Sequence, residues 1–206
     1  MKTYNVVFMG KAGTGKTSTI NNVFGLSWPT AAVEECTKLL FAAWIKDDSF
    51  LQQLPEYDSV MVMDTPGISA ALENDAHYMS FYEYALSIAD CLVWVSQGNT
   101  RADRADQEMI LRIKDKVKPE LKIVVCVNHI DKIGAEYKKN WPTTAEAPNE
   151  AMNALIVERC EDLRRKFSEI GYDLSSEVFV PCSGIRKYGY ANLLKKIFKR
   201  EENYNG

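Results

Sequence analysis

The chain has 206 residues, of which 46% are hydrophobic and 26% are charged, and its formal net charge is −3. This length and composition predict a single globular domain over residues 1–206, with a core spanning about residues 3–200. The mild negative charge argues against a dominant nucleic-acid-binding surface, which would require an excess of basic residues.

The cysteines and histidines favour reduced thiols over a disulfide framework or a metal cluster. Five cysteines occur with no CxxC spacing, and there are only two histidines. Such a pattern is typical of a cytoplasmic protein and leaves too few histidines for a multi-histidine metal site. No apolar run approaches the roughly 20 residues of a membrane span, and the first residues lack the apolar run of a signal peptide. We therefore expect a cytoplasmic location without a transmembrane segment.

Strand-like and helix-like patterns alternate along the chain. The predicted order is a strand at 4–9, a helix at 17–24, strands at 39–45 and 58–63, a helix at 75–88, a strand at 91–95, a helix at 104–117, a strand at 121–127, a helix at 152–170, a strand at 178–180 and a helix at 193–198. Uniformly apolar strands separated by amphipathic helices predict an α/β fold of three layers, with a mostly parallel six-stranded sheet covered on both faces. The segment from about residue 132 to about residue 149 is expected to form a long surface loop or short insertion.

The stretch GKAGTGKT, residues 10–17, fits the phosphate-loop pattern G-x-x-x-x-G-K-[ST]. A predicted strand precedes it and a predicted helix follows, which distinguishes it from an accidental glycine-rich turn. In such a loop the backbone N–H groups surround phosphate oxygens, Lys16 places its charge beside the β- and γ-phosphates, and Thr17 offers a hydroxyl to Mg²⁺. The candidate phosphate-binding residues are Gly10, Lys11, Ala12, Gly13, Thr14, Gly15, Lys16, Thr17 and Ser18.

A second motif, VMVMDTPG at residues 60–67, ends an apolar strand in an aspartate. Burying a carboxylate is costly unless a cation compensates it. After a phosphate loop, Asp64 is expected to reach Mg²⁺, and the N–H of Gly67 is expected to approach the γ-phosphate closely because glycine has no side chain. A plain turn that ends a strand is the alternative.

A third motif, Asn128-His129-Ile130-Asp131, follows the strand at 121–127. The N1–H and N2–H₂ groups of guanine are donors that a fixed Asp131 carboxylate can accept together, whereas adenine lacks this pair. Asn128 is suited to hold the loop and to approach the other edge of the base. This arrangement predicts a preference for GTP over ATP.

Together these motifs resemble the P-loop GTPase domain of the translation-factor class, and most closely its Era-like group. Residues 10–17, 64–67 and 128–131 are similar to the first, third and fourth motifs, and residues 182–184 to a degenerate fifth. The resemblance covers nearly the whole chain. It implies a Ras-like fold, Mg²⁺-dependent hydrolysis of GTP to GDP and phosphate, and guanine contacts from Ser183 and Gly184.

The resemblance also implies a threonine in the first switch segment that reaches Mg²⁺ and the γ-phosphate. Thr37 precedes the predicted second strand and is the chosen candidate, with Thr30 as the alternative. The metal ligands are then Thr17, Thr37 and Asp64, and the catalytic residues are Lys16, Thr37 and Gly67.

Three positions depart from the family pattern. His129 stands where lysine is usual, so its ring could stack on guanine or point to solvent. Gly13 replaces the asparagine that helps hold potassium in many Era-like proteins, which leaves potassium activation open. Ile68 stands where Ras-like enzymes place a glutamine that orients water. Because isoleucine cannot hydrogen-bond water, we expect slow intrinsic hydrolysis.

Two other functions stay open at this point. The chain could be a GTP- or GDP-binding interaction module with negligible hydrolysis, or an ATPase or kinase that uses the same phosphate loop. Besides the guanine nucleotide, its partner could be a protein, the ribosome or a second copy bound through the switch face. No nucleic-acid-binding module is recognised in the chain.

Overall fold

The computed structural model describes residues 1–30, 40–45, 47–67, 75–101 and 103–199. Its centre is a six-stranded sheet in the order β2-β3-β1-β4-β5-β6. The strands are β1 (Thr3–Met9), β2 (Phe41–Ile45), β3 (Ser59–Asp64), β4 (Cys91–Gln97), β5 (Lys122–Asn128) and β6 (Phe179–Pro181). Among the strands that the structure describes, the edge pair β2–β3 is antiparallel and the other pairs are parallel. The prediction of a mostly parallel six-stranded sheet is therefore confirmed.

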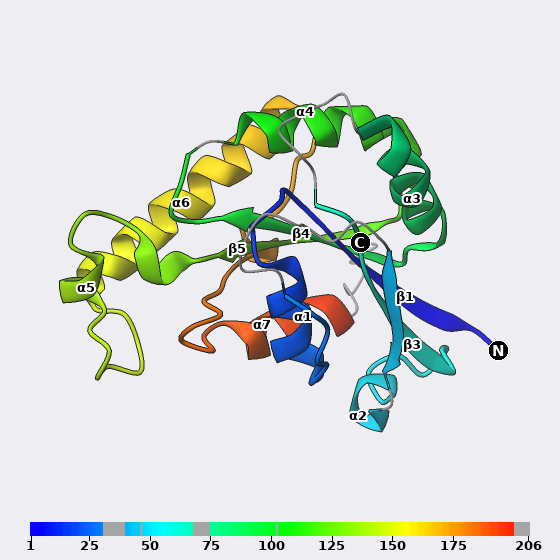
Figure 1. Ribbon diagram of the computed structural model, residues 1–206, viewed down its shortest axis with the longest axis horizontal. Coiled ribbons are helices and arrows are strands. Elements are labelled where there is room, and N and C mark those ends of the chain that lie inside the picture. Colours follow the sequence, from blue (N-terminus) through cyan, green and yellow to red (C-terminus); the bar gives the residue numbers. More distant parts are fainter. Residues whose placement is uncertain (31–39, 46, 68–74, 102, 200–206) are drawn as a thin grey trace, which may run out of the picture.

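Helices cover both faces of this sheet (Figure 1). Helices α3 (Asp75–Ile88), α4 (Arg104–Ile113) and α6 (Glu150–Glu169) lie on one face, and α1 (Lys16–Phe24) and α7 (Tyr190–Phe198) lie on the other. Two short helices, α2 (Asp48–Leu51) and α5 (Tyr137–Asn140), sit in connections. No helix in the described parts of the chain is long and apolar enough to cross a bilayer.

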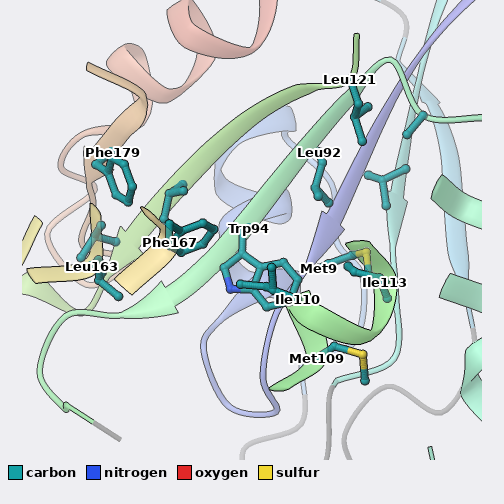
Figure 2. Packing of buried hydrophobic residues seen from close by; sticks show 14 of the residues in the cluster. Met9, Leu92, Trp94, Met109, Ile110, Ile113, Leu121, Leu163, Phe167 and Phe179 are labelled. Atoms are coloured by element: carbon teal, nitrogen blue, oxygen red, sulfur yellow. The ribbon is translucent and has the colours of Figure 1, made fainter. Parts of the chain in front are cut away.

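Each face has its own apolar core. On the α3, α4 and α6 side, Trp94 of β4 packs among Met109, Ile110 and Ile113 of α4, as Figure 2 shows. On the opposite side, a second buried cluster joins β1, β3, β4 and β5 to α1 and α7. Burial on both sides explains why the central strands read as unbroken apolar runs rather than as alternating ones.

Several predicted elements begin or end at other residues than those observed. The helix expected over 104–117 ends at Ile113 and continues as a 3₁₀ turn over Lys114–Lys116, so Val117 is extended and half-buried. Pro119 lies close behind and disfavours a helical residue before it. Residue Val178 lies in a 3₁₀ turn rather than in β6. Residues 132–149 contain α5 and the fully buried Trp141.

Candidate nucleotide-binding site

The strand register brings the three sequence motifs to one edge of the sheet. Phe8 of β1 is level with Asp64 of β3, and Gln97 of β4 is level with Asn128 of β5. Because these strands are parallel, their carboxyl ends meet at the same edge, where ligands of such folds bind. The phosphate loop leaves β1 at this edge and runs into α1 (Figure 1).

The phosphate loop folds around the Lys16 side chain and is hydrogen-bonded to it. The ammonium Nζ donates to the carbonyl oxygens of Gly10 at 3.0 Å and Lys11 at 3.2 Å, and the side chain is buried. Gly10 has φ +144, and a Cβ there would lie 2.3 Å from the Val95 carbonyl oxygen, so only glycine fits. The loop is therefore closed on a buried positive charge.

A hydrogen bond between Thr17 and Asp64 connects the end of the phosphate loop to β3. The Thr17 hydroxyl donates to Oδ2 of Asp64. The other carboxylate oxygen, Oδ1, is buried and has no hydrogen-bond partner among the described residues. Burial raises the pKa of Asp64, and the hydrogen bond from Thr17 and the charge of Lys16 oppose that rise.

This donor set fits a magnesium ion. The unpartnered Oδ1 of Asp64 is an oxygen acceptor held inside the fold, and the Thr17 hydroxyl lies beside the same carboxylate. Mg²⁺ prefers oxygen ligands and is commonly held by one or two carboxylates together with substrate phosphates. No group of three or more histidine, cysteine or acidic residues able to hold a metal occurs among the described residues.

The turn after Asp64 is hydrogen-bonded to β1 and α3 and approaches the phosphate loop closely. The Thr65 hydroxyl donates to the Phe8 carbonyl at 3.0 Å, and the Tyr82 hydroxyl of α3 donates to the Pro66 carbonyl at 3.2 Å. A Cβ on Gly67 would lie 2.9 Å from the Cα of Ala12, which is closer than side-chain carbons approach backbone. The absence of a side chain at Gly67 thus lets the turn touch the loop.

The third motif supplies a held carboxylate and an amide. The Ser183 hydroxyl donates to Oδ1 of Asp131 at 2.6 Å, and the backbone N–H of Arg186 donates to the Ser183 Oγ at 3.2 Å. Nδ2 of Asn128 donates to the Thr14 carbonyl at 2.9 Å. A direct hydrogen bond thus joins Asn128 to the phosphate loop.

The His129 ring lies against the phosphate loop. The residue has a left-handed backbone (φ 60) and is half-buried. Its Nε2 lies 3.6 Å from the position that a Cβ on Gly15 would take. Burial and the nearby Lys132 ammonium lower the pKa of His129, while the Asp131 carboxylate and the Gly13 backbone oppose this shift. A neutral imidazole with one donor is expected here.

Most of the predicted site residues are thus brought together, and their roles stay predictions. Two of the expected positions, Thr37 and Ile68, lie outside the described residues. The alternative Thr30 is exposed. Sequence reasoning missed Gln97, whose Nε2 donates to the Gly13 carbonyl at 3.0 Å. The only signal was its place as the polar last residue of an apolar strand.

A hollow of about 1020 Å³ lies elsewhere on the molecule. Its lining includes Tyr4, Asp90, Leu121 and Lys122, which mark the amino ends of β1, β4 and β5. This is the edge of the sheet opposite the three motifs. None of the predicted site residues lines this hollow.

Comparisons with known proteins agree with this geometry. The family described as "50S ribosome-binding GTPase" matches residues 5–129, which is more than half of the chain. GTPase Era from Aquifex aeolicus is 28% identical over 203 residues, covering 97% of this chain and 57% of that protein. The chain thus spans little more than half the length of this relative.

Two solved structures share the fold. Era in complex with MgGDPNP and nucleotides 1506–1542 of 16S ribosomal RNA superposes with a TM-score of 0.64 at 22% identity, covering 98% of this chain and 58% of that one. Toc33 from Arabidopsis thaliana with GDP and Mg²⁺ gives a TM-score of 0.68 at 16% identity, covering 96% and 84%.

At identities this low, the two solved structures support the fold alone. The assignment of the chain to a family rests on the match to the family model. The phosphate loop, Asp64 and Asn128 all lie within the matched residues. The chain belongs to the 50S ribosome-binding GTPase family and is an Era-like P-loop GTPase domain.

Proposed function

We propose that this domain binds GTP with Mg²⁺ and hydrolyses it slowly to GDP and phosphate. The observation that carries the proposal is the placement of Lys16, Thr17 and Asp64. A buried ammonium lies near a hydroxyl–carboxylate pair, and one carboxylate oxygen of that pair has no hydrogen-bond partner in the described part of the chain. This unit matches a magnesium-bound triphosphate in charge and in donor type.

The base would be selected by the third motif. Asp131, held by Ser183, can accept the N1–H and N2–H₂ groups of guanine. Asn128 uses one Nδ2 hydrogen on the Thr14 carbonyl, and its second hydrogen remains to donate to the N7 acceptor of the base. Adenine offers no donor pair to Asp131, which disfavours the ATPase or kinase alternative. In this proposal Gly184 and the backbone of Ser183 line the same end of the site.

In hydrolysis, water attacks the γ-phosphorus, the bond from that phosphorus to the β–γ bridging oxygen breaks, and the electron pair stays on GDP. Lys16 would stabilise the charge on the phosphate oxygens, and the N–H of Gly67 would contact the γ-phosphate. Thr17 and Asp64 would hold Mg²⁺, which would neutralise phosphate charge when bound. Thr37 is proposed as the third metal ligand from its sequence position.

Slow turnover follows from Ile68, which offers no hydrogen bond to the attacking water. The interaction module with negligible hydrolysis differs from this proposal only in rate. Multiple-turnover phosphate release with GTP, with and without Mg²⁺, separates the two functions. Sustained, magnesium-dependent release supports hydrolysis, and release no faster than from GTP in buffer would refute it.

Base preference needs its own measurement. Chromatography of the nucleotide carried by freshly purified protein, followed by displacement with GTP or ATP, tests the base and the affinity together. Bound GDP or GTP that ATP does not displace supports the assignment of Asn128 and Asp131. Bound adenine nucleotide would refute it.

Among the partners, we propose the ribosome first. The support is the description of the matched family as ribosome-binding and the solved Era complex with a 16S ribosomal RNA fragment. Co-sedimentation of the GTP-bound domain with ribosomal subunits tests this directly. If the domain is absent from both subunit fractions, the remaining candidate partners are another protein or a second copy bound through the switch face. Light scattering measures that self-association. The cytoplasmic location stays a prediction.

A further inference from the structure

The Gly13 carbonyl in the phosphate loop is held by the side chain of Gln97. Nε2 of Gln97, the last residue of β4, donates to it at 3.0 Å. Gly13 is exposed, has φ +78, and a Cβ there would meet no atom within 4 Å. Side-chain packing therefore does not hold the loop at this point, and the hydrogen bond from Gln97 does.

Gln97 is itself held from the opposite side. The backbone carbonyl oxygen of Gln97 accepts a hydrogen bond from Nη2 of Arg159 in α6 at 2.9 Å. Arg159 is 3% exposed and donates through both terminal nitrogens to Asp103, at 2.9 and 2.6 Å. Lys166 donates to the same carboxylate at 2.6 Å. Gln97 thus stands between the phosphate loop and a buried ion cluster.

The ion cluster is not explained by packing alone. Buried charges lose hydration, and replacing such a pair by apolar side chains of similar volume is often neutral or stabilising. Arg159 shares the buried face of α6 with Ile156 and Leu163, where an apolar residue would suit the core. What the guanidinium adds is a fixed donor, aimed at the backbone of Gln97 where β4 ends.

We infer that Gln97 is a positioning residue of the phosphate loop and that Arg159 holds it in place. The relay runs from α6 through the end of β4 to Gly13. Its effect on nucleotide affinity rests on the proposed function. Its effect on the loop itself does not, because the contacts are made within the protein.

The first test measures the loop in the nucleotide-free full chain. Gln97→Met keeps the length of the side chain and removes the donor, and Gln52→Met, at an exposed residue, is the matched control. Hydrogen exchange of the amides in residues 10–17 is expected to rise about five-fold in Gln97→Met, the loss of one neutral hydrogen bond. Unchanged exchange in Gln97→Met would overturn the inference.

The second test measures the release of a fluorescent GDP analogue. Release is expected to be about five-fold faster in Gln97→Met and in Gln97→Ala, and unchanged in Gln52→Met. If the wild-type chain binds no guanine nucleotide, the proposed function fails and exchange alone decides the positioning role. If it binds and Gln97→Met releases GDP at the wild-type rate, the inference is overturned whatever the exchange shows.

A double-mutant cycle tests the part of Arg159. Arg159→Lys keeps the charge and loses the two-pronged contact with Asp103, so exchange in residues 10–17 is expected to rise. Adding Gln97→Met is expected to raise it little further, because both variants break one relay. Fully additive effects would remove Arg159 from the relay. Where Arg159→Lys fails to fold by circular dichroism, Asp103→Asn, of equal volume, takes its place.

Discussion

Ser183→Ala removes the hydroxyl that holds the Asp131 carboxylate in the base site. The two oxygens are 2.6 Å apart, and both side chains are buried, with Ser183 fully so and Asp131 7% exposed. A hydrogen bond to a charged group contributes about 1.5–3 kcal/mol, which corresponds to roughly ten- to 150-fold in affinity if it is expressed wholly in binding. Because the backbone of Asp131 stays anchored in the 3₁₀ turn Ile130–Lys132, we expect the lower end, about ten-fold weaker GDP binding.

The assay is calorimetric titration of GDP and ATP into wild-type protein, Ser183→Ala and the exposed control Ser176→Ala. GDP affinity is expected to fall in Ser183→Ala alone, while ATP affinity is unchanged. The ratio of GDP affinity to ATP affinity therefore falls. Stability is expected to fall by about 1–3 kcal/mol, because the Arg186 N–H also loses its acceptor. If Ser183→Ala lost stability and kept wild-type GDP affinity, Ser183 would support the fold without orienting Asp131.

Three further variants test the rest of the site. Lys16→Ala is expected to weaken GTP binding by roughly 100-fold or more, since its buried ammonium is the charge beside the phosphates, and nanomolar affinity in equilibrium titration would contradict this. Asp131→Asn is expected to shift preference from guanosine to xanthosine nucleotides in competition binding, because an amide can donate to the xanthine 2-oxygen; unchanged selectivity would remove the base assignment. Burial, reinforced by the Asp103 carboxylate, raises the pKa of Asp106 to about 6, so its contribution to stability is complete below about pH 4 and is lost as pH rises through 6. Asp106→Asn is therefore expected to increase the free energy of unfolding at pH 7.5 by roughly 1–3 kcal/mol and not at pH 4, and an equal gain in urea titrations at both pH values would refute the cause.

Elements with strong local patterns were predicted well. The helix expected over 75–88 is α3, and the helix expected over 17–24 begins one residue earlier and is followed by Gly25 as predicted. These segments have one apolar face at helical spacing, and a glycine can adopt the left-handed conformation that ends a helix. The end of α4 was placed too late, because the apolar Val117 fits the spacing although the chain is already extended there.

The sequence patterns do not reveal charged residues on the buried faces of helices. The apolar stripe of the helix over 152–170 was recognised, but Arg159 lies on the same stripe and is 3% exposed. Helical spacing alone places Arg159 three residues after Ile156 and four before Leu163. Its partner Asp103 is 56 residues away in the chain, so no local pattern could reveal that the two charges meet.

The sequence by itself determined the local chemistry of this protein. The spacing of glycines, Lys16 and Thr17 makes a phosphate loop, and apolar runs make the strands that end in Asp64 and Asn128, because these depend on the conformation of neighbouring residues. Only the tertiary structure decided which atoms meet. The joining of Thr17 to Asp64, and of Gln97 to Gly13, depends on the order and register of parallel strands, which bring together groups 47 and 84 residues apart.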